Sequence, residues 1–133
     1  MDVVGALIAI LKADPAVPTD NILGGTLPRD INKSLPEMTV VLRRAGGPQA
    51  ASYQEWSNKR VDVDCFGADD KEASDLWDVV YATLRQLRRT VQDGVLIHRC
   101  DCTADGTSFV DPVATWPICA GTFMVTVADI AAA

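Results

Sequence analysis

Apolar side chains recur at helical spacing near the start of the chain. Four of them lie at positions i, i+3, i+4 and i+7, so they form one stripe along a helix. Asp2 can cap this helix, which we expect to run to about Lys12. Asp14-Pro15 ends it, because the residue before a proline is pushed out of the helical region. The stripe comprises Val4, Leu7, Ile8 and Leu11.

A longer apolar stripe predicts a second helix in the middle of the chain. Asp69 and Glu72 form a plausible capping box at its start. Acidic residues lie early in this segment and arginines lie late, as the helix dipole favours, so we expect the helix to end near Arg89. Trp77 lies on the stripe and is interpreted as a core residue. The stripe comprises Ala73, Leu76, Trp77, Val80, Leu84 and Leu87.

Strict alternation of apolar and polar residues gives the clearest strand, Arg60 to Cys65. Val61, Val63 and Cys65 share one face of it. Three further segments are rich in strand-forming residues, namely Glu37 to Leu42, Val95 to Cys102 and Gly121 to Val127. The pattern predicts an α+β fold in the order α-β-β-α-β-β, formed by residues 1–133 as a single domain. We expect a small four-stranded sheet, mostly antiparallel or mixed, with two helices packed on one face.

Three long polar segments separate these elements. They run from Ala13 to Pro36, from Arg43 to Ser57 and from Thr103 to Pro117. Loops of this length in a compact domain are usually functional or packed against something. Tyr53 and Trp56 lie in the second of them, with little reason to be buried within one subunit. Aromatic side chains in such places are enriched at protein interfaces.

Composition narrows the class of molecule. The chain has 133 residues, of which 48% are hydrophobic and 23% charged, as expected for one globular domain with a real core. The net charge of −6 makes a general nucleic-acid binder held by phosphate contacts a poor interpretation. The early apolar run from Val3 to Leu11 is too short to span a bilayer and lacks a basic flank, so we expect a protein made in a cytoplasm.

Candidate catalytic chemistry is sparse. Asp62 and Asp64 are two residues apart on one strand face, where their carboxylates could converge on a metal or act as an acid–base pair. His98 is the one histidine of the chain, and neither a nucleophile nor an orienting partner can be assigned to it. The favoured interpretation is a solvated strand face and a surface histidine. We therefore expect no catalytic set, no metal and no cofactor.

The four cysteines match the number that a structural zinc uses, but their spacing does not. Cys100 and Cys102 are separated by one residue on a predicted strand, whereas a zinc knuckle has C-x₂-C. The default expectation is reduced, mostly buried thiols. A pair of Cys119 with Cys100 or Cys102 would form only in an oxidising compartment. The remaining cysteine is Cys65.

Several segments, read in order, resemble the tail terminator family of long-tailed bacteriophages, also called tail completion or tail-to-head joining proteins. The likeness extends over nearly the whole chain, and its specificity lies in the order of short, degenerate pieces. Asp62 departs from the family, which often has an uncharged polar residue there. The matching pieces are Lys12-Ala13-Asp14-Pro15-Ala16-Val17, Leu35-Pro36-Glu37-Met38-Thr39-Val40-Val41, Arg60-Val61-Asp62-Val63-Asp64-Cys65-Phe66-Gly67, Glu72-Ala73 with Leu76, and Asp111-Pro112 with Trp116-Pro117.

The resemblance implies a structural protein of the virion and no enzyme. Such proteins close the tail tube as a ring, usually of six subunits, end tail polymerisation, and offer a surface to the head connector. The implied partners are further copies of the chain, the tail tube protein and a connector or neck protein, with DNA passing through the lumen without specific binding. The implied location is the tail–neck junction, with assembly in the host cytoplasm and no role for a membrane.

Within such a ring, the arginines at the base of the second loop could meet acidic residues of a neighbouring subunit, with loop aromatics supplying apolar contact. The candidate interface residues are Arg43, Arg44, Tyr53, Trp56, Asp69 and Asp70. Two alternatives stay open. One is a small soluble enzyme that uses Asp62, Asp64 and His98, and the other is a head-completion protein of the neck.

Overall fold

The computed structural model describes residues 2–25, 36–46, 56–112 and 115–129. In these ranges the chain forms two helices and six strands. The helices are α1 (Val3–Ala13) and α2 (Asp70–Arg85). The strands are β1 (Ile22–Gly24), β2 (Thr39–Gly46), β3 (Trp56–Phe66), β4 (Arg88–Gln92), β5 (Val95–Val110) and β6 (Pro117–Asp129).

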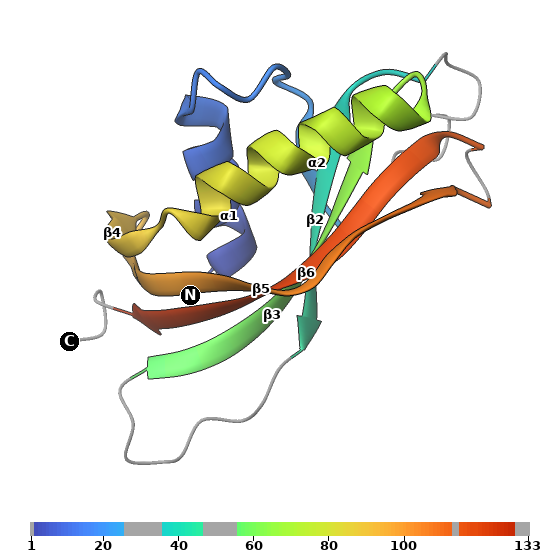
Figure 1. Ribbon diagram of the computed structural model, residues 1–133. Helices are drawn as coiled ribbons and strands as arrows, with labels where there is room; N and C mark the ends of the chain where they lie inside the picture. The colour runs from blue at the N-terminus through green and yellow to red at the C-terminus, as the bar shows by residue number, and fades with distance from the viewer. Residues whose placement is uncertain (1, 26–35, 47–55, 113–114, 130–133) are drawn as a thin grey trace.

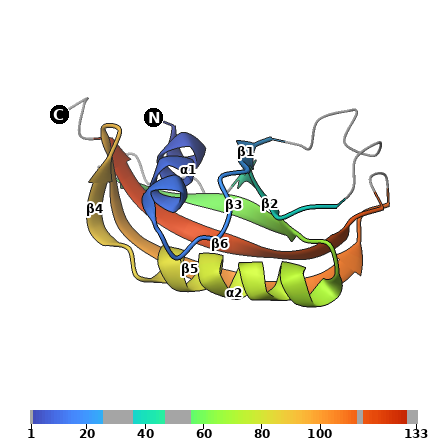
Figure 2. The same cartoon turned by 90° about the horizontal axis from the view of Figure 1, so that it is seen from above.

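All six strands in the described part of the chain belong to one curled, mixed sheet with the order β1-β2-β3-β6-β5-β4. Only β1 and β2 pair in parallel there, and the other neighbours are antiparallel. Figure 1 shows both helices on one side of this sheet, and Figure 2 shows how the long strands β5 and β6 bend along their length. The expectation of a four-stranded sheet with the order α-β-β-α-β-β is therefore wrong.

The two strands that were not expected, β1 and β4, lack a sequence pattern that predicts a strand. β1 is three residues long and lies inside the segment expected to be a loop. β4 is an edge strand with the sequence RRTVQ, in which apolar and polar residues do not alternate. The apolar stripe of α2 also seemed to continue through Leu87, although the helix ends at Arg85, with Gln86 as its cap.

The strands β5 and β6 extend well beyond their expected bounds. Residues 103–110 continue β5 and are exposed or half-buried throughout. Most side chains of this segment are exposed, and α2 contacts it only through a few residues such as Trp77 and Ser74. Its sequence therefore does not alternate regularly, and it was interpreted as a polar loop. Together with the beginning of β6 it forms a ribbon that reaches the far end of the molecule from β4 (Figure 1).

Both helices begin at the residues expected to cap them. Asp2 accepts a hydrogen bond from the backbone N–H of Gly5 at 2.8 Å. Asp69 accepts one from the N–H of Glu72, also at 2.8 Å. The Glu72 carboxylate accepts from the N–H of Ala68. These contacts satisfy N–H groups that a helix start leaves without partners.

The main core lies between the helices and the inner face of the sheet. Val61, Val63 and Cys65 of β3 all have no exposed surface, which confirms the strand face expected from the alternation. Trp77 of α2 is 3% exposed and packs on Phe123 of β6, with ring centroids 5.6 Å apart. This burial of apolar surface is the main force that holds the helices on the sheet.

The outer face of the sheet carries a smaller apolar cluster near one end. Trp116 is 1% exposed there and meets the ring of Phe66 edge-on at 6.0 Å. The cluster also includes Val41 and Ile118. Asp64 of β3 lies on this outer face as well and is 7% exposed, so the face is not uniformly solvated.

Candidate assembly surfaces

The candidate catalytic residues do not converge. Asp62 accepts a hydrogen bond from the Thr122 hydroxyl at 2.8 Å, and Asp64 is held by the guanidinium of Arg43. His98 lies at a register shift of β5, two strands away from β3. The register places it about 15 Å further along the strands than Asp62. Each residue has its own local surroundings, and these three do not form one site.

Asp64 and Arg43 form a partly buried ion pair across β2 and β3. The Asp64 side chain is 10% exposed and that of Arg43 is 38% exposed. Burial raises the pKa of Asp64 above its usual value, while the hydrogen bond and charge of Arg43 act in the opposite direction. The interpretation of Asp64 as a solvated carboxylate is therefore wrong, and its pairing makes it a structural residue.

The cysteines are free thiols in this structure and are not gathered into one group. Cys65 of β3 lies directly opposite Cys119 of β6, whereas Cys100 and Cys102 lie opposite Val125 and Phe123. The suggested partners of Cys119 are thus wrong, because β3 supplies its neighbour. Burial raises the pKa of Cys100 to about 12 and that of Cys65 well above its usual value. Such thiols are poor nucleophiles and poor metal ligands at neutral pH.

No group of three or more His, Cys, Asp or Glu side chains in the described ranges is arranged to hold a metal ion. Neither α1 nor α2 is long and apolar enough to cross a membrane.

The six residues expected at an interface occupy different places. Arg43 is engaged by Asp64, whereas Arg44 is exposed at the end of β2. Asp69 caps α2, and Asp70 is exposed in its first turn. The interface role of these four residues stays a prediction.

The two loop aromatics cannot be placed as side chains. Tyr53 and most of the segment from Arg43 to Ser57 lie outside the described residues. Trp56 is the first residue of β3, opposite Ala128 of β6, and its side chain also lies outside the description. The ends of this segment are strand, so the expected loop is shorter than predicted.

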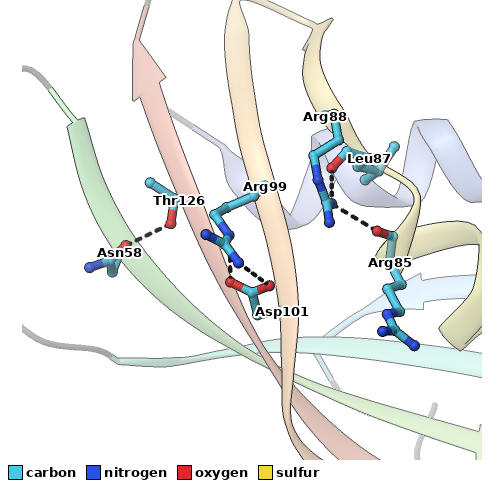
Figure 3. Close-up of polar contacts among 7 residues, drawn as sticks. All are labelled: Asn58, Arg85, Leu87, Arg88, Arg99, Asp101 and Thr126. Carbon is cyan, nitrogen blue, oxygen red and sulfur yellow. Dashed lines mark hydrogen bonds and ion pairs between the residues drawn. The ribbon is translucent and has the colours of Figure 1, made fainter.

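Two groups of exposed charged side chains lie along α2 and the strands beside it. We call the first the basic end; it consists of Arg85, Arg88, Arg89 and Val91, at the end of α2 and in β4. Figure 3 shows how Arg88 donates hydrogen bonds to the backbone carbonyls of Arg85 and Leu87. Arg85 donates to the Tyr81 hydroxyl and lies over its ring.

We call the second surface the acidic end. The Ser74 and Ser108 hydroxyls meet at 3.3 Å and join α2 to the far part of β5. Asp70 and Asp78 lie one helical turn on either side of Ser74. Asp105 of β5 accepts a hydrogen bond from the Trp77 indole N–H at 3.0 Å. The acidic end consists of Asp70, Asp78, Asp105, Phe109 and Val110.

Both groups also include exposed apolar side chains. Among the described residues, the large hydrophobic side chains classed as exposed are Val91 at 56%, Phe109 at 45% and Val110 at 58%. The first belongs to the basic end and the other two to the acidic end. The adjacent apolar pair Phe109-Val110 inside a segment interpreted as a polar loop was the signal available in the sequence.

Comparison with known proteins gives a likeness of fold. A scan against protein-family models finds no match, and a search of curated proteins finds none either. Among solved structures, the chain is similar to one in the virion of a native gene transfer agent (GTA) particle, with a TM-score of 0.68 and 14% sequence identity. The match covers 95% of this chain and 94% of that one, so the likeness extends over the whole fold.

Proposed function

We propose that this protein is a structural component of a phage-like virion, where it closes the end of the tail tube as a ring. The observation that carries the proposal is the fold shared over 95% of the chain with a chain of a gene transfer agent virion. A fold alone does not define a function. The ordered resemblance of five segments to tail terminators supplies the specific role.

In this role the ring, of six subunits by analogy with the family, ends tail polymerisation and offers its other side to the head connector. Its partners are neighbouring copies, the tail tube protein and a connector or neck protein. DNA passes through the lumen. The net charge of −6 suits a channel that must not hold DNA, because like charges repel the phosphate backbone.

Deletion of the gene in the phage or prophage that encodes it tests this role. We expect tails of uncontrolled length, or tails without heads, in electron micrographs of the lysate, and wild-type particles after complementation. Tails of normal length on filled heads would contradict the proposal. Normal tails beside heads that have lost their DNA would indicate the head-completion role instead.

The enzyme alternative predicts a different result. Asp62→Asn and His98→Gln should then abolish complementation although the variant proteins fold. Under the proposal both variants restore normal particles, because the two residues lie far apart and take no part in chemistry.

A further inference from the structure

The far part of β5 is an edge of the sheet that no described strand covers. β4 pairs with β5 only between Val95 and Arg99, so in the described ranges the rest of β5 has β6 as its one strand neighbour. We propose that residues 107–110 of this edge bind an extended segment of a partner polypeptide, which joins the sheet as a further strand. This inference goes beyond the proposed role in the tail, because it assigns a site to a second polypeptide of defined chemistry.

The backbone of residues 107–110 is suited to such pairing. The register shifts of β5 end at Thr107, and from there to Val110 the pairing with β6 is regular. In an antiparallel strand, successive residues direct their N–H and C=O groups to opposite sides. Every second residue of this segment therefore presents a donor and an acceptor to the open edge. An added strand would pair with them, as in other cases of β-augmentation.

The other two edges in the described part of the sheet differ from this one. β1 is only three residues long. β4 carries Arg88 and Arg89, and the φ angle of 48° at Arg89 interrupts its extended backbone. Short edge strands, charges and backbone irregularities are the usual means by which proteins keep a sheet edge from pairing. The segment 107–110 has the sequence Thr-Ser-Phe-Val, without a charge or a proline, so it lacks these protections.

The helix α2 sets a charge preference on the inner side of this edge. The Ser74 hydroxyl lies 3.3 Å from that of Ser108, so α2 lies beside this part of β5. Asp70 and Asp78, one helical turn on either side of Ser74, are exposed, and neither makes an ion pair with another described residue. A side chain of the added strand that points toward α2 would meet these carboxylates, so a lysine or arginine fits there best.

The outer side of the edge favours an apolar side chain. Phe109 lies opposite Ile118, which belongs to the apolar cluster of the outer face, so both side chains are on that face. Phe109 is 45% exposed, and an apolar residue of the added strand would cover part of it. Because side chains of a strand alternate between the two faces, the partner segment should alternate basic and apolar residues.

Residue-resolved hydrogen exchange of the full-length protein tests the site with synthetic peptides. At saturation, a peptide of alternating lysine and valine should slow the exchange of the outward amides in residues 107–110 at least about tenfold. A lysine–proline peptide carries the same charge but cannot donate to a ladder, so it should leave these amides unprotected. A glutamate–valine peptide meets the carboxylates of α2 and should bind at least about tenfold more weakly.

Charge reversal on α2 should exchange this preference. The variant with Asp70→Lys and Asp78→Lys should bind the glutamate–valine peptide more tightly than the lysine–valine peptide. Asp20→Lys is the matched control, because it reverses an exposed carboxylate just before β1, at the opposite edge of the sheet. It should bind the peptides as the wild type does. Thermal melts establish that the variants are folded, and the comparison of peptides on the wild-type protein needs no variant.

The proposal is overturned if the lysine–valine peptide leaves these amides unprotected at about 1 mM, or if the lysine–proline peptide protects them equally. A reversed variant that still prefers lysine would overturn it as well. Protection in the protein alone that grows with its concentration would assign the edge to a second copy and overturn the proposed partner. None of these measurements involves the tail, so their failure leaves the virion role intact, and failure of the gene-deletion test leaves the edge site standing.

Discussion

Each residue of β3 faces either the helices or the outer side of the sheet, and the two sides tolerate different side chains. Val63 lies on the inner side with no exposed surface. Arg60, three residues earlier, lies exposed on the outer side. An aspartate introduced at position 63 would therefore meet apolar side chains, whereas an aspartate at position 60 would meet water.

Val63→Asp should unfold the domain. An unpaired carboxylate in the core costs several kcal/mol, a large part of the roughly 5–15 kcal/mol that stabilise a typical domain. Circular dichroism should show loss of the folded signal at room temperature. Arg60→Asp is the control and should melt within about 2 °C of the wild type. A folded Val63→Asp protein with an unchanged melt would mean that the face assignment is inverted.

The ion pair of Asp64 and Arg43 predicts a dependence of stability on pH. Because the pKa of Asp64 is raised in the folded protein above 3.8, ionising this group costs stability as pH rises through that range. Arg43→Met removes the interactions that lower this pKa, so the cost grows. We expect the free energy of unfolding to fall by about 1–2 kcal/mol at pH 7 and to change little at pH 3.

Urea denaturation at the two pH values measures this difference. In an Asp64→Asn background the same Arg43→Met change should lose its pH dependence, because the titrating carboxylate is gone. Equal destabilisation at pH 3 and pH 7 would show that Arg43 acts through packing and not through the charge of Asp64.

The helices and strands differ in how clearly their own sequences indicate them, and this determines which of them could be predicted. α1, α2 and the inner face of β3 each bury one side against the core, so their apolar periodicity marks them. β4 and residues 103–110 of β5 bury little and leave no such mark. The opposition of Cys65 and Cys119 depends on β3 pairing with β6, which joins segments far apart in the chain. Pairing between strands that are far apart in the chain leaves no local pattern in the sequence, so it could not be predicted.

At the level of packing between elements, Gly121 of β6 provides the space for α2. A methyl group there would lie 2.3 Å from the Trp77 indole and 2.5 Å from the Ala104 carbonyl oxygen. Gly121→Ala should therefore lower the free energy of unfolding by about 1–3 kcal/mol, as overpacking does. Thermal unfolding measures the loss. Trp77→Leu in the same chain should recover part of it, and complete additivity of the two changes would contradict this explanation.

At the scale of the whole molecule, the proposed ring requires that surfaces of this domain contact other copies of it. A substitution of Trp56 tests whether the beginning of β3 contributes to such a contact. We expect Trp56→Ala to keep the melting temperature nearly unchanged while complementation yields overlong or headless tails. A much lower melting temperature would instead place Trp56 in the core of its own subunit and remove it from the interface.

The central claim is that this chain forms a ring between tail tube and head. Cryo-electron microscopy of the complete particle tests it most directly, with the fold fitted into density along the tail. We expect a single closed ring of this fold at the head-proximal end of the tube. Density for this fold repeated along the tube, at the distal tip, or absent from the particle would contradict it.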